Sequence, residues 1–393
     1  MYLVEKHIIN QYHSFFNECD ELCFKSKNIY NQGLYNVRQH YFKNNEYLNY
    51  YKNYHVTKLQ ECYKELPTKV FCQTLKMVDQ NFKSFFGLLK NKNIKNHIPK
   101  YLDSKNGRYL TKFPKQALSI KEFKTTGKIL LSQTHINIQT KIKDFNSIKE
   151  VRIVPLNDRY VIEIVYKIKE KDKKENGIIA GIDLGLNNFA AVVFNDGSNP
   201  LLFNGRQLKS INQYYNKRKS YYQSKLEKNT YTSKKIKQLT NKRNNIINNY
   251  LHNISRELVN QLVSHNVMTL VIGKNVNMKQ DINLGKVNNQ NITNIPLFKF
   301  VDIIKYKCEL EGINVILQEE SYTSKCSFFD NEEIKKHDNY LGKRIKRGLF
   351  KTFNGLLINA DVNGAYNILK KAIPNAFTNG IEGVGVHPLM INI

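Results

Sequence analysis

Apolar positions recur at helical spacing in the first part of the chain, from about Ile9 to Lys95. The segment that follows Pro67 is the clearest case, because five apolar side chains fall on one broad face: Val70, Leu75, Val78, Phe82 and Phe85. Proline favours the first turn of a helix, and this spacing is typical of a helix that buries one side. We therefore predict a helical region over residues 9–95.

The pattern changes to alternation from about His97. The stretches HINIQTKI, EVRIVPL and YVIEIVYKI switch between apolar and polar residues and are separated by Gly, Asn and Asp. A period of two is typical of strands that bury one face, so we predict a small antiparallel β module. The charged run from Lys169 to Gly177, KEKDKKENG, indicates a linker at the end of this module.

A new domain is predicted beyond Gly177, where GIIAGIDLG and NFAAVVFNDG have the pattern of strands, the first of the buried type. The polar stretch from Arg206 to His265 predicts a helical hairpin laid across a sheet. It is followed by the strand VMTLVIG, the loop-like KNVNMKQDINLGKVNNQNITN, a helix from Pro296 to Glu311, the strand NVILQEE and the helix NADVNGAYNILKKAI. The order β-β-α-β-α-β-α predicts an α/β domain with a mixed sheet.

Charge and composition narrow the choice of partner. The 393 residues carry 61 Lys and Arg against 33 Asp and Glu, and this formal charge of +28 favours a polyanionic partner. The length favours two or three domains, and 41% hydrophobic residues suffice for their cores. Because no membrane-spanning run and no signal peptide is found, we expect a soluble intracellular protein. The six scattered cysteines form no C-x-x-C pair and are expected to be reduced and mostly buried.

Two aspartates stand where an α/β fold places its active sites. Asp183 follows the apolar strand GIIAGI at the carboxyl end, and Asp361 lies near the start of the last helix. Taken alone, Asp183 is better explained as a turn former or helix cap, and Asp361 as an N-cap or first-turn acid of its helix. Together they are two of the three or four carboxylates that a two-metal phosphodiester cleavage site takes. A third acid must come from the central elements of the domain.

Three blocks of the sequence resemble the RuvC-type nuclease domain of the TnpB family, the transposon-encoded RNA-guided DNA endonucleases related to type V CRISPR effectors. They are GIDLGLNNFAAVVFNDG, YLHNISRELV, and YTSKCS followed by INADVNGAYNIL. The resemblance implies an α+β multidomain protein with a C-terminal RuvC-like (RNase H-like) α/β nuclease domain over residues 176–373, including a degenerate zinc-finger insertion at about 323–358. It further implies a helical recognition lobe (9–95), a small β-barrel wedge module (1–8 and 96–175) and a C-terminal tail (374–393).

The resemblance also implies catalytic roles for the matching acids. The first acid of the family pattern falls on Asp183 and the last on Asp361, whereas the middle glutamate falls on Gly273 in TLVIGKN. Two interpretations follow. Either the domain lost its third metal ligand and binds DNA without cutting it, or the carboxylate moved to the next strand, NVILQEES. The second resembles relatives of the family that carry a relocated glutamate just before their T-S block.

Physical chemistry favours relocation. Carboxylates added beside Asp183 and Asp361 cost about 1–4 kcal/mol of repulsion at about 4 Å unless a cation compensates them. Neighbouring residues of a strand face opposite ways, so only one of Glu319 and Glu320 can be a ligand. The position three residues before the Thr of the T-S block selects Glu320 and leaves Glu319 in reserve. The alternative is a solvated strand end whose charge is paired with Lys325 or another cation.

A second departure from the family follows the T-S block, where members usually carry two zinc-binding Cys pairs. Here Cys326 is followed by Phe328 and Phe329, and no later cysteine exists. One thiol, with His337 as the only nearby histidine, cannot complete a four-ligand zinc site. We expect no zinc, and an insertion held by packing of Phe328, Phe329 and Ile334.

Basic residues in the helical stretch and in GKRIKRG predict nucleic-acid contacts, because few acids are present to pair with them. A solvated helix face is the plainer alternative. The predicted contact residues are Lys217, Arg218, Lys219, Lys234, Lys235, Lys242, Arg243, Lys343, Arg344 and Arg347.

Taken together, these features predict an RNA-guided DNA endonuclease of a transposable element, in which Asp183, Glu320 and Asp361 hold two Mg²⁺ ions. Its expected partners are a transposon-derived guide RNA of the omega type and double-stranded target DNA with an adjacent motif, in the bacterial cytosol and associated with the nucleoid, with no membrane partner. One alternative is a nuclease-inactive RNA-guided DNA-binding repressor. Another is a plain RNA-binding protein or transposase accessory factor, against which the aspartate pair argues.

Overall fold

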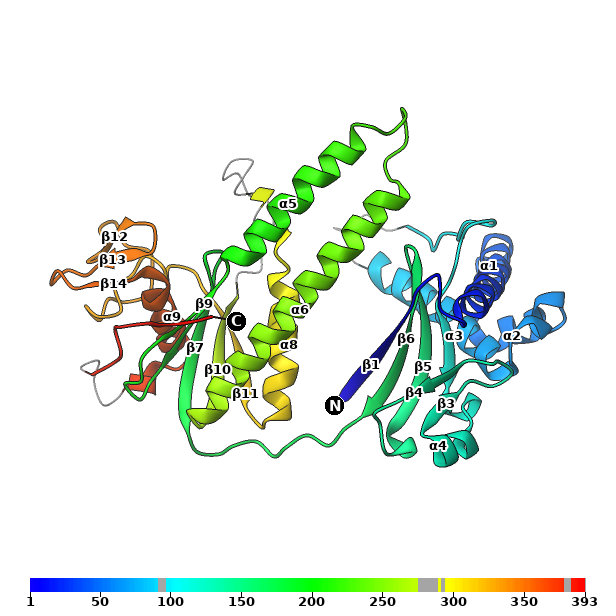
Figure 1. Cartoon of the computed structure of the whole chain (residues 1–393), viewed down its shortest axis with the longest axis horizontal. Coiled ribbons are helices and arrows are strands. Elements are labelled where there is room, and N and C mark those ends of the chain that lie inside the picture. The colour runs from blue at the N-terminus through cyan, green and yellow to red at the C-terminus, as the bar shows by residue number, and fades with distance from the viewer. Residues whose placement is uncertain (91–96, 275–288, 291–293, 378–382, 393) are drawn as a thin grey trace. The chain divides into compact units, whose positions relative to one another are not determined.

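The chain folds into two compact units, Met1–Lys169 and Glu170–Ile393 (Figure 1). The computed structural model describes residues 1–90, 97–274, 289–290, 294–377 and 383–392. The boundary between the units falls at the start of the charged run that the sequence marks as a linker. Most of the predicted loop KNVNMKQDINLGKVNNQNITN and part of the C-terminal tail lie outside the described residues.

Helices dominate the first part of the first unit, as predicted. They are α1 (Phe16–Asn44), α2 (Tyr50–Lys58) and α3 (Thr68–Leu89). The predicted apolar face of α3 is confirmed, because Val70, Leu75, Val78 and Phe82 are fully buried. Each such side chain contributes roughly 1.5–3 kcal/mol on burial. Gly33 lets α1 approach this face, since a Cβ there would lie 2.5 Å from the Leu75 Cδ2 atom.

The β module of the first unit is an antiparallel four-stranded sheet in the order β1-β6-β5-β2. A separate ladder pairs β3 with β4, and helix α4 packs near it. The closed barrel predicted for this module is therefore not formed as a continuous hydrogen-bonded ring among the described residues. The edge strand β2 is short and ends at Pro114, which has no N–H to extend the pairing. The bounds are β1 Tyr2–Ile9, β2 Thr111–Pro114, α4 Ile120–Thr126, β3 Lys128–Leu130, β4 Asn137–Gln139, β5 Ile148–Leu156 and β6 Arg159–Lys167.

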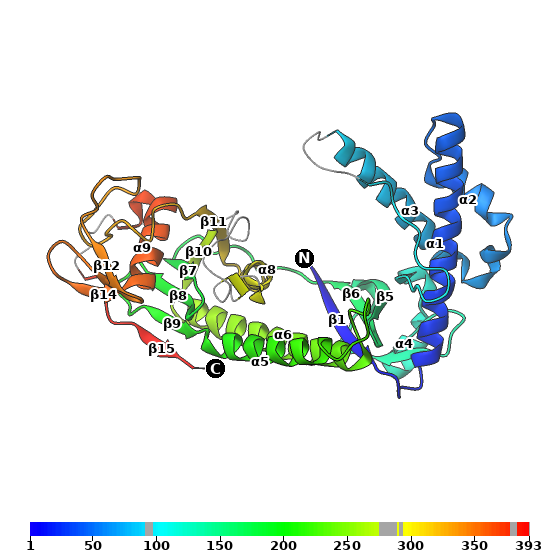
Figure 2. The same ribbon diagram turned by 90° about the horizontal axis from the view of Figure 1, so that it is seen from above.

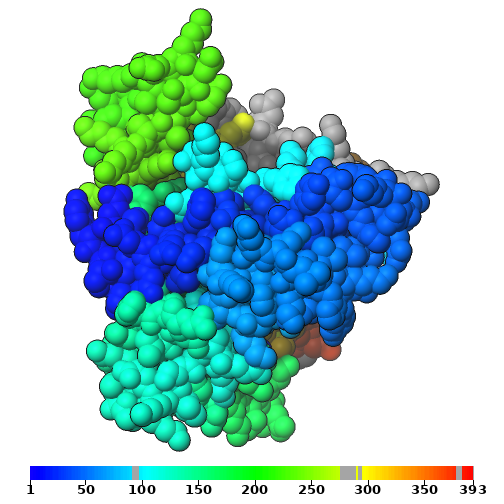
Figure 3. Space-filling model, turned by 90° about the vertical axis from the view of Figure 1, so that its right-hand side faces the viewer, coloured from blue at the N-terminus to red at the C-terminus, as the bar shows by residue number. Residues whose placement is uncertain are grey.

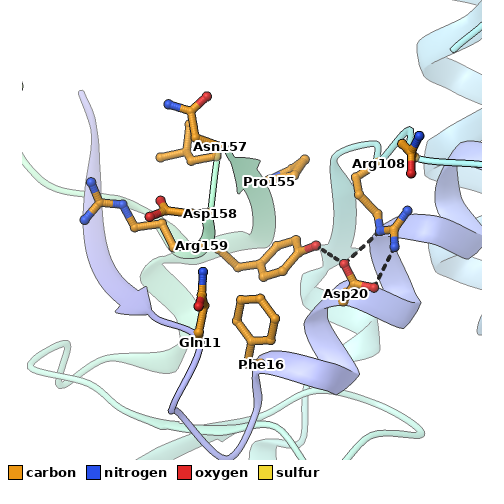
Figure 4. Close-up of a pocket in the computed structure, with 11 residues that line it drawn as sticks. Gln11, Phe16, Asp20, Arg108, Pro155, Asn157, Asp158 and Arg159 are labelled. Atoms are coloured by element: carbon orange, nitrogen blue, oxygen red, sulfur yellow. Dashed lines mark hydrogen bonds and ion pairs between the residues drawn. The ribbon is translucent and has the colours of Figure 1, made fainter. Parts of the chain in front are cut away.

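A polar clamp joins α1 to the sheet of the first unit (Figure 4). The Asp20 carboxylate accepts hydrogen bonds from Arg108 Nε at 2.8 Å and Nη2 at 2.7 Å, and a further one from the Tyr160 hydroxyl. The hydrogen bond from Arg108 lowers the pKa of Asp20 below its ordinary value. The ring of Phe16 meets that of Tyr160 edge-on, with centroids 5.3 Å apart. These groups form one wall of a pocket of about 400 Å³.

The second unit is built on a mixed six-stranded sheet in the order β11-β10-β7-β8-β9-β15, so the prediction of a mixed sheet is confirmed. Strands β11, β10 and β7 are parallel, and β8 runs antiparallel to its two neighbours. Strands β9 and β15, and a small sheet β12-β13-β14, were not predicted. The strand bounds are β7 Ile178–Leu184, β8 Asn188–Phe194, β9 Leu201–Asn204, β10 Val267–Lys274, β11 Asn314–Glu319, β12 Lys343–Lys346, β13 Leu349–Lys351, β14 Leu357–Asn359 and β15 Leu389–Ile391.

Helices cover both faces of this sheet (Figure 1). Helices α6 (Lys234–Ser264) and α8 (Leu297–Leu310) share a core with one face, which includes Phe189, Leu258 and Phe300. Helix α9 (Ala360–Ala372) packs on the opposite face through residues such as Tyr366. The second unit therefore has three layers, with α6 and α8 on one side, the sheet in the middle and α9 on the other side, so α9 packs directly against the sheet. No helix in the described ranges combines the length and apolar content needed to cross a membrane.

The predicted helical hairpin is confirmed as α5 (Arg206–Gln223) and α6, which lie alongside each other (Figure 2). Only Leu208 and Asn212 of α5 are buried, so this helix is almost entirely a surface element. Polar contacts hold the pair together. Tyr215 Oη lies 3.1 Å from Thr240 Oγ1, and Arg243 donates to Asn212 Oδ1 at 2.7 Å and 2.9 Å.

Candidate active site

Three acids from three elements gather at the carboxyl end of the parallel strands. Asp183 lies near the end of β7, Glu320 follows β11 directly, and Asp361 lies in the first turn of α9. Parallel strands end at the same edge of a sheet, where α/β folds place their sites. Burial, then repulsion from Asp361 and from Glu320, raise the pKa of Asp183 to about 8. The carboxylates are therefore close enough to act on one another electrostatically.

Two glycines make room for these carboxylates. A Cβ at Gly364 of α9 would lie 2.8 Å from Asp183 Oδ2, so only glycine lets the helix pass this close to the acid. A Cβ at Gly273 of β10 would lie 3.0 Å from Glu320 Oε2. Gly273 is the position at which the family pattern carries its middle glutamate. The Glu320 carboxylate thus occupies space that a side chain at Gly273 would enter.

Glu319 and Glu320 have opposite environments. Glu319 is 55% exposed, and its carboxylate lies 2.8 Å from Lys371 Nζ and accepts the Ser321 N–H at 2.7 Å. The hydrogen bond from Lys371 is the main cause that lowers the pKa of Glu319 to about 2. Burial, followed by repulsion from Glu319, raises the pKa of Glu320. The solvated strand end considered as an alternative therefore describes Glu319, paired with Lys371 and not with Lys325.

Asp361 does not cap its own helix. Asn359 is the cap, and its side chain accepts from the N–H groups of Asp361 at 2.9 Å and Val362 at 3.2 Å. The Asp361 carboxylate is left free for side-chain contacts. It accepts from Asn188 Nδ2 at 2.8 Å and lies 3.4 Å from Arg344 Nη2. Sequence reasoning assigned no role to Asn188, although it belongs to the quoted block GIDLGLNN.

A hollow of about 360 Å³ opens beside Asp361 and carries positive charge. Arg206, Arg344 and Arg347 line it together with Asp361, whereas Asp183 and Glu320 are not part of its lining. The nearby Lys209 has its pKa lowered by burial and then by repulsion from Arg347 and Arg206. Three arginines clustered beside the Asp361 carboxylate suit the binding of a phosphate-bearing ligand.

The donor chemistry of the three acids suits a hard divalent cation. Carboxylate oxygens are the ligands that Mg²⁺ prefers, and the pKa of Asp183 is raised mainly by burial and then by the neighbouring acids, although Arg344 lowers it. Within the described ranges, no three His, Cys, Asp or Glu side chains are grouped closely enough to hold a metal ion. The three acids thus have the donor chemistry for such an ion, but as placed they do not form a ready three-ligand site, and Arg344 beside Asp361 is a competing positive charge.

Comparisons with known proteins found similarity to two family models and to individual proteins. A family model described as a probable transposase, OrfB of IS605, matches residues 163–279, and a model of the Cas12f1-like TNB domain matches residues 298–368. The TnpB-like protein ORF457 of Acidianus two-tailed virus is 26% identical over 248 residues, which cover 61% of this chain and 50% of that protein. These matches make the chain similar to the TnpB family.

The other similar proteins point the same way. The CRISPR-associated endodeoxyribonuclease Cas12f2 of a Micrarchaeota archaeon is 26% identical over 230 residues, 55% of this chain and 41% of that protein. The chain thus spans half or less of the length of these two curated relatives. A structure of a Cas12f1-sgRNA-target DNA complex shares the fold, with a TM-score of 0.57, 17% identity, and coverage of 91% of this chain and 83% of that one.

In this TnpB-like chain, two asparagines of the block ADVNGAYNI hold the loop after the T-S block. Asn363 Oδ1 accepts the Phe328 N–H at 3.0 Å, and Asn363 Nδ2 donates to the Cys326 carbonyl at 2.9 Å. Asn367 Nδ2 donates to the carbonyls of Thr323 and Cys326 at 2.9 Å and 2.8 Å. This role of the two asparagines was not predicted from the sequence. The only signal for it in the sequence is their separation of four residues, about one helical turn, which puts them on the same face of α9.

Carboxylates and aromatic rings organise the segment in which relatives usually bind zinc. Glu332 is buried and accepts the N–H groups of Ser327 at 2.7 Å and Leu341 at 3.0 Å. Phe328 stacks on the ring of Tyr366, with centroids 4.7 Å apart. Phe329 meets the same ring edge-on, as expected for the packing role given to this phenylalanine. Ile334 is only half-buried and does not belong to the apolar clusters of the described residues.

The basic residues predicted to contact nucleic acid fall into different surroundings. Lys217, Lys234, Lys235 and Lys242 are exposed on the hairpin, and Arg218 and Lys219 are half-buried on α5. Lys343 and Arg347 are exposed near β12, and Arg344 of β12 contacts Asp361. Arg243 is half-buried, and its guanidinium donates hydrogen bonds to Asn212 and to the Asn294 carbonyl. These N–H groups are therefore used within the protein and not turned toward a ligand.

Proposed function

We propose that this TnpB-like protein is an RNA-guided DNA endonuclease of a transposable element, with Asp183, Glu320 and Asp361 as its catalytic carboxylates. One observation carries the proposal. The Glu320 carboxylate lies beside Gly273, where the family pattern expects a glutamate, and it raises the pKa of Asp183 together with Asp361. This supports relocation of the third acid over its loss.

Each residue of the proposed site has a distinct task. Two Mg²⁺ ions held by Asp183, Glu320 and Asp361 would supply activation of water and stabilisation of the leaving oxygen in phosphodiester hydrolysis. Asn188 fixes the orientation of the Asp361 carboxylate through its 2.8 Å hydrogen bond. Arg206 and Arg347 line the adjoining hollow and provide binding for the phosphates of the DNA strand.

The proposed partners are a transposon-derived guide RNA of the omega type and double-stranded target DNA with an adjacent motif. The similar solved structure is described as a complex with sgRNA and target DNA, and the net charge of +28 suits two polyanions at once. Pairing with the guide would select the sequence, while the protein contacts the backbone. The proposed phosphate contacts are Lys217, Arg218, Lys219, Lys234, Lys235, Lys242, Lys343 and Arg347.

The domain roles are likewise proposed from the family. Residues 9–95 would form the recognition lobe and residues 1–8 and 96–175 the wedge module. Residues 176–373 would form the nuclease domain, with residues 374–393 as a tail. The mixed helical and sheet content of the two units supports this division.

A nuclease-inactive, RNA-guided DNA-binding repressor is the second candidate, and a specific observation favours it. Arg344 lies 3.4 Å from the Asp361 carboxylate and already balances part of its charge without a metal ion. In a protein that no longer cleaves DNA, this ion pair would stabilise the Asp361 carboxylate in place of a metal ion.

Incubation of the protein–guide complex with a guide-matched plasmid in Mg²⁺ distinguishes the two candidates. The endonuclease linearises the plasmid, and Asp183→Asn abolishes this while retaining target binding in a gel-shift assay. Tight target binding without cleavage by the unmodified protein would establish the repressor. Binding to RNA without guide-directed binding to DNA would exclude both.

A further inference from the structure

The outer end of the α5–α6 hairpin is a separate basic and aromatic surface, which we call the hairpin tip (Arg218–Lys235). It comprises the last turns of α5, the connecting loop and the first residues of α6. Ser233 caps α6 by accepting the Ile236 N–H at 3.3 Å, and Asn229 adopts a left-handed backbone with φ 73°. The loop therefore has a defined turn and holds its side chains in place.

Tyrosine rings and cations are interleaved at the hairpin tip. The Arg218 guanidinium lies over the rings of Tyr221 and Tyr222, 5.7 Å and 5.2 Å from their centroids. Lys225 Nζ lies 4.4 Å from the centroid of Tyr221, and Lys235 Nζ lies 5.5 Å from that of Tyr222. Such cation–π contacts orient the rings while leaving the charges at the surface.

The positive charge of the hairpin tip is not neutralised by the protein. The segment contains one acid, Glu227, against six cations: Arg218, Lys219, Lys225, Lys228, Lys234 and Lys235. None of these cations forms an ion pair with a carboxylate in the described part of the chain. A surface helix whose charges serve only solubility usually mixes both signs.

Two of the three tyrosine rings of the hairpin tip are exposed, and Tyr222 is half-buried. Tyr221 is 48% exposed and Tyr231 is 80% exposed. Tyr221, but not Tyr231, lines a hollow of about 480 Å³, together with Arg218, Tyr222, Lys225, Leu226, Ser233 and Lys235. The tip is part of the green region at the upper left of Figure 3.

We propose that the hairpin tip binds an unpaired segment of nucleic acid, whose bases stack on Tyr221 and Tyr231 and whose phosphates contact Lys225 and Lys235. Exposed rings between cations are the surface that single strands prefer, since every base offers a π-face and every nucleotide a charge. A duplex buries those faces within its own stack and would use only the cations. The segment is single-stranded RNA, as in an unpaired part of the guide, or a displaced DNA strand.

This inference rests on the proposed action on nucleic acid but not on the carboxylate site. The test therefore measures binding in EDTA, where cleavage does not contribute. The full-length protein is titrated into three labelled probes of about 20 nucleotides, namely unstructured single-stranded RNA, single-stranded DNA of the same sequence, and the corresponding DNA duplex. Fluorescence anisotropy gives the affinity for each probe.

Tyr221→Ala is expected to weaken binding of a single strand about tenfold, the loss typical of one stacking ring, and to change duplex binding less than about twofold. Tyr221→Phe keeps the ring and is the matched control, with single-strand affinity within about twofold of the original. Lys225→Gln should lower the salt dependence for all three probes. The single strand that suffers the larger loss identifies the source as RNA or DNA.

Three outcomes would overturn the inference. They are an unchanged single-strand affinity in Tyr221→Ala, an equal loss on duplex and single strand, or an equal loss in Tyr221→Phe. Because Tyr221 lies at the exposed end of the hairpin, thermal melting of both variants should match that of the original protein. If both candidate functions fail in the plasmid assay while stacking persists, the hairpin tip is independent of them.

Discussion

At the scale of single residues, the neighbouring acids Glu319 and Glu320 show what a sequence can and cannot predict. Strand alternation predicts that they face opposite ways, and the structure confirms it. Lys371 of α9 engages Glu319, with its Nζ atom 2.8 Å from the Glu319 carboxylate, and this leaves Glu320 as the acid near Asp183. That contact depends on how α9 packs on the sheet, so strand alternation alone could not reveal it, and only the position before the T-S block selected Glu320.

Asp20 gives a prediction at the same scale. Its folded-state pKa is lowered mainly by Arg108, so its contribution to stability is complete above its ordinary pKa, about 3.9, and is lost as pH falls through the folded-state value. Asp20→Asn should reduce the free energy of unfolding by about 1 kcal/mol at pH 7, a figure that allows for partial exposure to solvent.

Urea denaturation of Asp20→Asn and the unmodified protein between pH 7 and pH 3 tests this prediction. The two free energies of unfolding should converge as the pH falls below about 4. A difference that stays constant over this range would show that the Arg108 contact is not the cause.

At the scale of elements, the close approach of α9 to β7 depends on Gly364. An alanine Cβ there would lie 2.8 Å from Asp183 Oδ2 and displace that carboxylate. Alanine favours the helix itself by up to about 1 kcal/mol, which offsets the crowding. Gly364→Ala should therefore remain folded and lose cleavage by about tenfold or more, because a displacement of about 1 Å in a catalytic group is costly.

Gly87→Ala in α3 is the matched control, since nothing lies within 4 Å of the added Cβ. It should raise the free energy of unfolding by about 0.5–1 kcal/mol and leave cleavage unchanged. Cleavage at the original rate in Gly364→Ala would contradict the account of this contact.

The longer elements could be predicted because their apolar periodicity is local, as in α3 and in the parallel strands around Asp183. The missed strands β9, β12, β13, β14 and β15 have three or four residues each. A strand this short shows no period, and its pairing is decided elsewhere in the chain. Strand β15, for example, pairs with β9, whose residues lie almost two hundred positions earlier.

At the scale of the whole molecule, charge is the dominant property and predicts strong salt dependence. A chain with a net charge of +28 that contacts six or more phosphates should lose about a thousandfold or more in affinity for duplex DNA between 50 and 200 mM salt. Anisotropy titrations at several salt concentrations give the slope. A slope near zero would mean that its cations do not contact phosphates.

The family resemblance rested on blocks that the structure explains one by one. Gly364 gives room to Asp183, Asn188 holds Asp361, and Asn363 and Asn367 hold the loop at Cys326. The packing of the segment after Cys326 could not be foreseen in this detail. It depends on Glu332 accepting backbone N–H groups from residues on either side of it in the sequence.

The central claim is that the third carboxylate of the site moved from position 273 to Glu320. Its most direct test is the rate of guide-directed plasmid cleavage in Mg²⁺ by Glu320→Gln and Glu319→Gln, two isosteric changes at adjacent positions. We predict that Glu320→Gln cleaves at least about a hundredfold more slowly than the unmodified protein, while Glu319→Gln stays within about threefold. Equal rates in the two variants would contradict the account.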